Sequence, residues 1–433
     1  MRTITALAAA ITLSTSSAQT YYPPLVGNTW QTVDPESLGW CTDEIPALID
    51  FLGQSNTKAF IVLKDGRIAI EHYFSTFTQD SLWYWASAGK SLTAFLVGKA
   101  QEEGFLNIDQ PSSDFLGEGW TSCATAQEQE ITIRNQLSMT TGLDDGVPEP
   151  DCTDPQCLEC FAEPGTRWAY HNAPYTLLDG VIEEATGQTL NAYLFNKLTL
   201  TTGMQGAYVQ LDNNNVFFSK SRAMARFGLL CMSQGNWNGT DVIADQAYFN
   251  EMTSPSQGLN ESYGYLWWLN GQSSYMLPGL QLQLPGMLCP AAPADAYSAM
   301  GKNGQICNVS PATGLVVVRL GNLPTQGIFV PNVYNNDIWL RLNDVICTST
   351  GIADAMTSIS LKPAPNPATG LVQLMSDGSM AYRVELRASD GRLVLSGSNM
   401  AHVDAALLPA GHYSLTVLDG NGRMQHAPLL VAH

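Results

Sequence analysis

The run Ser87-Ala88-Gly89-Lys90-Ser91-Leu92-Thr93-Ala94-Phe95-Leu96-Val97-Gly98 decides how this chain is interpreted. It places a serine hydroxyl and a lysine amine three residues apart at the start of an apolar, helix-compatible segment. Residues three apart lie on the same side of a helix, so the amine of Lys90 can reach the hydroxyl of Ser87. A neutral lysine can activate a serine, provided that burial lowers the lysine pKa. The run therefore predicts an acyl-transfer nucleophile.

The same spacing occurs elsewhere in the chain without that context. Ser55-Asn56-Thr57-Lys58 precedes the strand-like run 59–63, and no apolar helix follows it. Alone, a serine and a lysine at this spacing more often mark a solvated helix turn than a catalytic pair. The interpretation of Ser87 and Lys90 therefore depends on companion residues.

The first companion is Tyr170-His171-Asn172, which follows a turn at Pro164-Gly165. A tyrosine phenol beside a lysine ammonium can act as a base or an acid. The amide of Asn172 can hold the lysine and a substrate carbonyl together. For His171, which lies between them, a bystander role is the more frequent one.

The second companion is Gly301-Lys302-Asn303-Gly304-Gln305, which comes before the β-forming run 315–320. Turn residues at 310–314 separate the two segments and predict a hairpin. Lys302 is expected on a strand beside the serine, where a second cation lowers the pKa of Lys90 or Tyr170. The flanking glycines allow a substrate to approach the backbone closely.

Together with 137–143 and 224–230, these motifs resemble the serine β-lactamase-related superfamily, and most of all its class C-like branch of esterases, D-amino-peptidases and amidases. The resemblance covers about residues 35–347. It implies the following roles: Ser87 as nucleophile, Lys90 as its base partner, Tyr170 as second general base or acid, Asn172 as orienting amide, and Lys302 as electrostatic support. It also implies an oxyanion hole from the backbone N–H groups of Ser87 and Gln305, with Gly304 among the substrate-binding residues.

The resemblance implies an α/β (α+β) fold in which helices flank an antiparallel sheet and a helical subdomain is added. The sequence is consistent with this, because helical stretches at 93–103 and 173–186 alternate with strand pairs at 59–74 and 301–320. We expect one hydrolase domain over residues 19–347.

The residues after Lys302 bear on the substrate. Penicillin-recognising members of the family usually carry Lys-Thr-Gly followed by serine or threonine, whereas this chain has Asn303 and Gln305. We therefore expect a serine hydrolase of a small-molecule ester, amide or peptide, with no cofactor and no metal. The alternatives are a D-alanyl peptidase or β-lactamase, and a catalytically silent penicillin-binding-like receptor or surface-binding module. Three tryptophans fit an acyl pocket or the core: Trp168, Trp267 and Trp268.

Residues 1–18 have the pattern of a signal peptide, with Met1-Arg2, an apolar run at 6–11 and small residues at 16–18. No later segment has the pattern of a transmembrane helix. A net charge of −19 argues against electrostatic binding of nucleic acid or anionic lipid. We expect a protein that is secreted or held at the cell surface after passing the periplasm.

The cysteines fit such export, and their odd number leaves at least one free. They are Cys41, Cys123, Cys152, Cys157, Cys160, Cys231, Cys289, Cys307 and Cys347. Cys231 is predicted to be a buried thiol. Cys152, Cys157 and Cys160, with Cys123, are predicted to hold one loop by disulfides. Cys289 with Cys307, and Cys41 with Cys347, are the remaining expected pairs.

A second region begins after a small, polar linker at 348–362. From Pro363 to His433 short alternating runs are separated by turns, which predicts a small β-sandwich. Three pieces resemble the C-terminal sorting domain of the type IX secretion pathway: Pro365-Asn366-Pro367-Ala368, Asp390-Gly391-Arg392 and Leu408-Pro409-Ala410-Gly411-His412-Tyr413. The resemblance implies the type IX secretion machinery as a partner. An adhesion or carbohydrate-binding module is the alternative.

Overall fold

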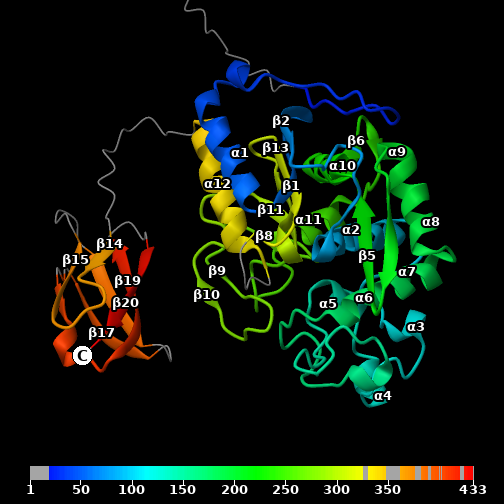
Figure 1. Ribbon diagram of the computed structural model, residues 1–433. Helices are drawn as coiled ribbons and strands as arrows, with labels where there is room; N and C mark the ends of the chain where they lie inside the picture. Colours follow the sequence, from blue (N-terminus) through cyan, green and yellow to red (C-terminus); the bar gives the residue numbers. More distant parts are fainter. Residues whose placement is uncertain are drawn as a thin grey trace, which may run out of the picture. The chain divides into compact units, whose positions relative to one another are not determined.

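The computed structural model describes residues 19–324, 330–347, 361–375, 382–388, 392–398, 400, 402–419 and 424–432. The chain divides into two compact units, residues 1–348 and 349–433, which are considered separately below (Figure 1). The expected signal peptide lies outside the described residues, as does the expected linker up to residue 360.

The first unit is built around a six-stranded antiparallel sheet with the strand order β2-β1-β13-β12-β11-β8. Its strands are β1 (Thr57–Lys64), β2 (Arg67–Tyr73), β8 (Trp268–Leu269), β11 (Tyr297–Gly301), β12 (Gln305–Ser310) and β13 (Leu315–Gly321). Every residue of β12 and β13 is buried, because helices cover both faces of the sheet. The predicted hairpin is confirmed, since β12 pairs with β13 from Ile306↔Arg319 to Ser310↔Leu315.

One face of the sheet carries α10 (Ser221–Met232), and the other carries α1 (Ile45–Gln54) and α12 (Asn332–Ile346), which lie side by side (Figure 1). Neighbouring residues of β12 show the two faces. The thiol of Cys307 lies 3.8 Å from the carbonyl oxygen of Met224 on α10. The amide of Asn308 donates to Asn335 Oδ1 on α12 at 2.8 Å. The predicted antiparallel sheet flanked by helices is therefore confirmed.

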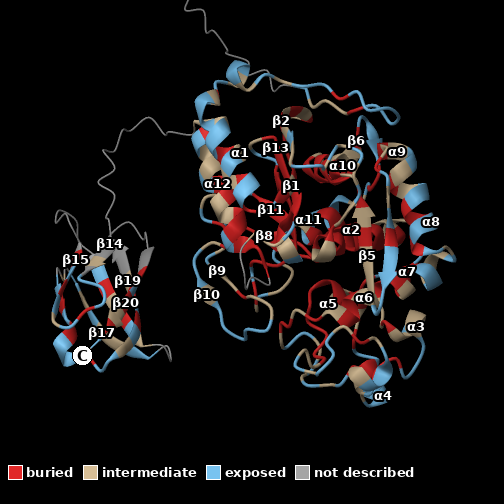
Figure 2. Ribbon diagram, in the orientation of Figure 1, coloured by how far each residue is buried: buried red, intermediate tan, exposed pale blue. Residues whose placement is uncertain are grey.

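Helix α2 (Gly89–Glu102) begins two residues after Ser87 and is buried along most of its length (Figure 2). It contacts α7 (Leu178–Thr186) and α11 (Gln246–Met252). The helical part of the unit also contains α3 (Ser113–Leu116), α4 (Thr125–Glu128), α5 (Ile133–Leu137), α6 (Asn172–Thr176), α8 (Leu190–Leu194), a π-helix (Phe195–Thr199) and α9 (Leu200–Thr202). A small sheet orders β3 (Trp83–Tyr84), β5 (Asn214–Ser219) and β4 (Gly206–Leu211) as β3-β5-β4.

Short elements complete the unit. Two-stranded sheets are formed by β6 (Asn236–Trp237) with β7 (Thr240–Asp241), and by β9 (Ser274–Tyr275) with β10 (Leu284–Pro285). The 3-10 turns are η1 (Pro35–Leu38), η2 (Thr42–Glu44), η3 (Ala86–Ala88), η4 (Pro155–Cys157) and η6 (Lys302–Gly304).

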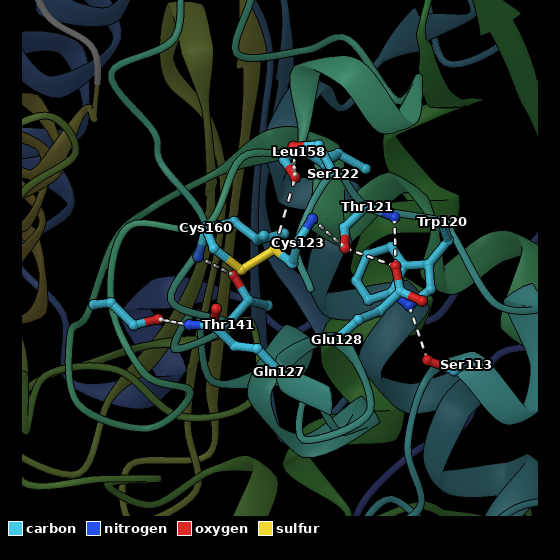
Figure 3. Close-up of a disulfide and its surroundings, with 12 residues drawn as sticks. Ser113, Trp120, Thr121, Ser122, Cys123, Gln127, Glu128, Thr141, Leu158 and Cys160 are labelled. Atoms are coloured by element: carbon cyan, nitrogen blue, oxygen red, sulfur yellow. Dashed lines mark hydrogen bonds between the residues drawn. A yellow bond between two sulfur atoms is a disulfide. The ribbon is translucent and has the colours of Figure 1, made fainter. Parts of the chain in front are cut away.

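Two disulfides hold the loops between α3 and α6, as predicted for this group of cysteines. Cys123 is bonded to Cys160, and Cys152 to Cys157. Beside the first, the buried carboxylate of Glu128 accepts hydrogen bonds from the backbone and hydroxyl of Thr121 at 2.7 and 2.6 Å (Figure 3). Cys157 and Cys160 are three apart but bond to different partners, which suits structural rather than redox disulfides.

The remaining cysteines test the other expectations. Cys41 is bonded to Cys347, as expected, and Cys231 is a buried free thiol. The expected pair of Cys289 with Cys307 is wrong, because both are free and buried. Cys307 points toward α10, whereas Cys289 Sγ accepts a hydrogen bond from Asn335 of α12 at 3.6 Å. The sheet therefore separates the two thiols.

The second unit consists of two small antiparallel sheets, ordered β14-β15-β18 and β17-β16-β19-β20. The strands are β14 (Leu361–Ala364), β15 (Leu371–Met375), β16 (Tyr382–Ala388), β17 (Leu393–Ser398), β18 (His402–Asp404), β19 (Gly411–Asp419) and β20 (Met424–Val431), with one 3-10 turn, η7 (Ala405–Leu407). Val372, Leu386, Leu415 and Leu429 are among the residues of its own apolar core. The predicted small sandwich is therefore present, although Asp390 and Gly391 of the matched piece 390–392 lie outside the described residues.

Candidate active site

Ser87 lies in the turn η3, immediately before α2, and is half-buried. The preceding residue Ala86 has a φ of 47°, a left-handed conformation that a non-glycine residue adopts only where its surroundings impose it. The end of β11 packs against this turn. A Cβ atom on Gly301 would lie 2.4 Å from the carbonyl oxygen of Trp85 and 3.0 Å from the nitrogen of Ser87. Only glycine therefore lets β11 approach the nucleophile so closely.

Lys90 is buried, with 4% of its surface exposed. Its Nζ lies 3.8 Å from the ring centre of Tyr175 and 5.5 Å from that of Tyr170. Burial lowers the pKa of Lys90 to about 7, although the negative charges of Asp151 and Asp179 act in the opposite direction. About half of the Lys90 amines are therefore neutral at pH 7 and able to accept a proton.

Tyr170 lies near both Lys90 and Ser87. Burial raises the pKa of Tyr170, whereas a hydrogen bond with Ser87 acts to lower it. The phenol is therefore protonated at neutral pH, and it is hydrogen-bonded to the hydroxyl of Ser87. Its ring stacks on Trp268, with centres 5.8 Å apart and planes 18° apart, which fixes its orientation. The structure thus brings Ser87, Lys90 and Tyr170 together.

Asn172 opens α6, and its Nδ2 donates to Asp151 Oδ1 at 2.7 Å. Its Oδ1 is buried and has no hydrogen-bond partner among the described residues, so this acceptor is open to a donor. His171 is 2% exposed, and burial lowers its pKa. Neither ring nitrogen of His171 has a partner within the described chain, so no hydrogen bond joins it to Ser87, Lys90 or Tyr170.

Lys302 differs from the expectation in one respect: it lies in the turn η6 between β11 and β12 and not within a strand. The reason is the left-handed backbone of the next two residues, since Asn303 has a φ of 67° and Gly304 a φ of 77°. Lys302 is exposed, and it follows Gly301, which packs against Ser87. The side chain of Gln305 is fully buried, and its Nε2 donates to the carbonyl of Gly321 at 2.7 Å. The Gln305 side chain is therefore engaged within the sheet, where the residue pairs with Gly301.

Sequence reasoning did not identify three residues that lie near Lys90 in the structure: Tyr175, Asp151 and Asp179. Asp179 is buried on α7, accepts a hydrogen bond from Asn215 at 3.0 Å, and has one oxygen without a partner in the described chain. Burial raises the pKa of Asp179 to about 7. The four-residue spacing of Tyr175 and Asp179 indicates a shared helical face, which is the one local signal for this pair.

The tryptophans belong to the core. Trp168, Trp267 and Trp268 are 1%, 0% and 2% exposed. Trp168 and Trp268 pack with Tyr170 and Tyr263, and ring centres lie between 4.9 and 6.4 Å apart. The rings of Trp168 and Trp268 pack against Tyr170. Because all three tryptophans are buried, they do not line an open acyl pocket.

Two further observations concern the part of the chain that the structure describes. Nowhere in that part do three or more His, Cys, Asp or Glu side chains converge as metal ligands would. The helices described there are also too short or too polar to cross a bilayer.

Comparison with known proteins gives a consistent result. A model of the family described as beta-lactamase matches residues 53–327. The chain is 22% identical over 321 residues to the 6-aminohexanoate-dimer hydrolase of Paenarthrobacter ureafaciens, which covers 65% of this chain and 76% of that protein. An uncharacterized protein of Alkalihalophilus pseudofirmus is 23% identical over 316 residues, or 64% of this chain and 85% of its own length. A penicillin-binding protein homologue from Caulobacter crescentus shares the fold, with a TM-score of 0.53 and 14% identity over 71% of this chain and 98% of the other.

Proposed function

Because this chain belongs to the beta-lactamase family, we propose that it is an exported serine hydrolase that cleaves an ester, an amide or a small peptide through an acyl-enzyme on Ser87. The observation that carries this proposal is the buried Lys90, whose pKa of about 7 makes it a base at neutral pH. Tyr170 is hydrogen-bonded to Ser87, and its ring centre lies 5.5 Å from the Lys90 amine. A strongly desolvated lysine beside a candidate nucleophile is typical of a functional site, which favours the hydrolase over the binding-module alternative.

The reaction follows from this arrangement. Neutral Lys90 accepts a proton by way of Tyr170, which takes the proton of Ser87 as the oxygen attacks the substrate carbonyl carbon. The carbonyl oxygen becomes an oxyanion, and the backbone N–H groups of Ser87 and Gln305 stabilise it. Collapse breaks the bond to the leaving group, which receives the proton through Tyr170. Water, activated by the same base, then attacks the acyl carbon and releases Ser87.

The residues around Lys302 indicate which class of substrate the site accepts. Lys302 is exposed and can meet an anionic group of a substrate. The side chains of its neighbours are engaged elsewhere: Asn303 donates to the Tyr84 hydroxyl at 2.7 Å, and Gln305 bonds to Gly321. Asn303 and Gln305 stand where penicillin-recognising relatives carry hydroxyl residues for the β-lactam carboxylate, so we favour simple esters and amides. The name of the relative 6-aminohexanoate-dimer hydrolase supports a hydrolytic reaction in the family.

Labelling with a fluorophosphonate, followed by intact mass, tests the proposal. We expect one adduct on the folded wild type, none on Ser87→Ala, and labelling about 100-fold slower on Tyr170→Phe, because a general acid or base contributes about that much. A screen of esters, amides and β-lactams then defines the leaving group. A folded wild type that forms no adduct would contradict the proposal and favour a catalytically silent receptor or surface-binding module.

We also propose that residues 363–433 act as a type IX sorting domain, and that residues 1–18 direct the chain out of the cytoplasm. Support comes from the motifs at Pro365-Asn366-Pro367 and 408–413, and from the independent apolar core of this unit. Three disulfides in the first unit suit an oxidising compartment. Deletion of residues 349–433 should leave the protein in the periplasm of a host with this pathway, and unchanged export would contradict the assignment.

A further inference from the structure

Asp151 lies in a loop that meets the active site at the start of α6. Its Oδ1 accepts the hydrogen bond from Asn172 Nδ2 at 2.7 Å, and the carbonyl oxygen of its neighbour Pro150 accepts one from the backbone N–H of Ala173 at 3.3 Å. The N-cap residue of α6, His171, makes no capping hydrogen bond with its side chain, so the loop supplies acceptors to the first turn of the helix. Two consecutive residues of the loop therefore hold two consecutive residues of α6.

The first residue of α6, Asn172, follows Tyr170 by two positions. Tyr170 is hydrogen-bonded to Ser87. Before Tyr170 in the chain, the backbone N–H of Ala169 donates to the carbonyl of Met139 at 2.9 Å. After Tyr170, the two contacts with the loop follow. The segment that carries the phenol is thus held on both sides, and the loop provides the hold on the side of α6.

The loop is itself constrained, because a disulfide begins directly after Asp151. Cys152 is buried and bonded to Cys157, and its backbone N–H donates to the carbonyl of Glu149 at 3.0 Å. Surface loops without such ties are the more mobile parts of a fold. The half-buried carboxylate of Asp151 is therefore presented to α6 from a backbone that a turn and a disulfide confine.

The charge of Asp151 also reaches Lys90. The titratable groups of the described chain that face the buried amine of Lys90 are Asp151, Asp179, Tyr170 and Tyr175. Burial lowers the pKa of Lys90, and of the two carboxylates that act against this lowering, Asp151 has the larger effect. Loss of the Asp151 carboxylate should therefore displace the titration of Lys90, whereas loss of a purely structural contact would leave it in place.

We propose that Asp151 is a positioning residue of the active site: from its disulfide-bonded loop it holds the segment 170–172, and with that segment the phenol that is hydrogen-bonded to Ser87. The inference rests on the proposed hydrolase function. It follows from the paired contacts between the loop and α6, which place Asp151 beside the segment that carries Tyr170. Asp151 acts through Asn172 and Tyr170, and it does not touch the substrate.

The test measures the second-order rate of Ser87 labelling by a fluorophosphonate between pH 5 and pH 9. Asp151→Asn removes the charge but keeps an oxygen that can accept from Asn172, whereas Asp151→Ala removes both. Asp154→Asn and Asp154→Ala are the matched controls, because Asp154 is an exposed carboxylate of the same loop whose side chain makes no capping hydrogen bond. Thermal unfolding is recorded for every variant.

For both Asp151 variants we expect the rise of the rate with pH to occur at lower pH. Labelling at pH 6, relative to the rate above pH 8, should increase at least about twofold, because a negative charge that favours protonated Lys90 is lost. Above pH 8, Asp151→Asn should label within about threefold of the wild type, whereas Asp151→Ala should label about tenfold more slowly, since a displaced catalytic group loses rate. The Asp154 variants should keep the wild-type rate and profile.

A folded Asp151→Ala that labels at the wild-type rate above pH 8 would overturn the inference. So would a pH profile that stays in place in both Asp151 variants, or one that moves equally in the Asp154 variants. If Asp151→Ala does not fold, Asp151→Asn decides: a displaced profile supports the inference, and an unchanged profile overturns it. A wild type that is not labelled at all defeats the proposed function, a result distinct from these.

Discussion

The strongest prediction concerns the pH dependence of Ser87 reactivity, which should follow the neutral form of Lys90. With a pKa of about 7 instead of the ordinary 10.5, half of the Lys90 amines are neutral at pH 7, about one tenth at pH 6 and about one hundredth at pH 5. An exposed lysine would be neutral in only about one molecule in 3,000 at pH 7. Burial therefore raises the amount of active base at pH 7 by about 1,600-fold.

The assay is the second-order rate of fluorophosphonate labelling between pH 5 and pH 9, corrected with Ser87→Ala. We expect the rate to rise about tenfold per pH unit below pH 7 and to level off above pH 8. Lys90→Arg, which stays protonated, should lose at least about 100-fold at every pH. A wild-type rate that is constant from pH 5 to pH 8, or that is still rising tenfold per unit at pH 9, would refute the reasoning.

Asp179 provides the necessary control, because its pKa is also raised to about 7 and it is coupled to Lys90. The negative charge of Asp179 raises the pKa of Lys90. In Asp179→Asn the rise of the labelling rate with pH, called the acid limb below, should therefore occur at lower pH and keep its shape. Disappearance of the limb in this variant would assign the titration to Asp179 instead.

Three further predictions concern stability and thiol chemistry. Lys90→Met should abolish labelling yet raise the free energy of unfolding at pH 6, by at most about 5 kcal/mol for a pKa that falls from 10.5 in the unfolded chain to about 7 in the folded one. Because the folded wild type binds fewer protons than the unfolded chain only above pH 7, this gain should shrink as the pH rises from 7 toward 10.5. Equal stabilisation at pH 6 and pH 9 in chemical denaturation would contradict this. The double change Cys41→Ser/Cys347→Ser removes a disulfide that closes a loop with a sequence separation of 306, so the unfolded chain gains conformational entropy. The free energy of unfolding should fall by about 5 kcal/mol, measured by denaturant titration against the protein with the intact disulfide. The thiols of Cys289 and Cys307, each with its pKa raised to about 12 by burial, should resist iodoacetamide in the native protein and react after unfolding; fast labelling of folded protein would show that they are accessible.

Much of the fold could be predicted because the relevant signals are local. The alternation of apolar strands and turns indicated the hairpin of β12 and β13, and the apolar run after Ser87 indicated the buried helix α2. The position of Lys302 was misjudged because the left-handed backbone at Asn303, two residues after Gly301, turns the chain. The dipeptide Asn303-Gly304 is itself a turn signal, and it was given too little weight.

The surroundings of Lys90 could not be predicted in the same way, because they arise from packing between distant segments. Asp151 is brought to Asn172 by a loop that disulfides hold, and Asp179 is buried where α7 meets α2. The expected disulfide between Cys289 and Cys307 was wrong for a similar reason. The sequence places both cysteines near apolar residues, but only the structure shows that their thiols lie on opposite faces of the sheet.

The pairing of β1 with β13 has a consequence for how the chain folds. Thr57 lies opposite Gly321, and Cys41 is bonded to Cys347, so the centre of the sheet joins the earliest strand to the last one of the unit. A chain that emerges N-terminus first, from a ribosome or through a translocation pore, can pair β1 with β2 but lacks β13, the other neighbour of β1, until residues 315–321 appear. The apolar strand β1 is then an open edge on a nascent chain, and such edges aggregate. This protein should therefore depend on a chaperone or on fast emergence more than a protein whose neighbouring strands are consecutive in sequence.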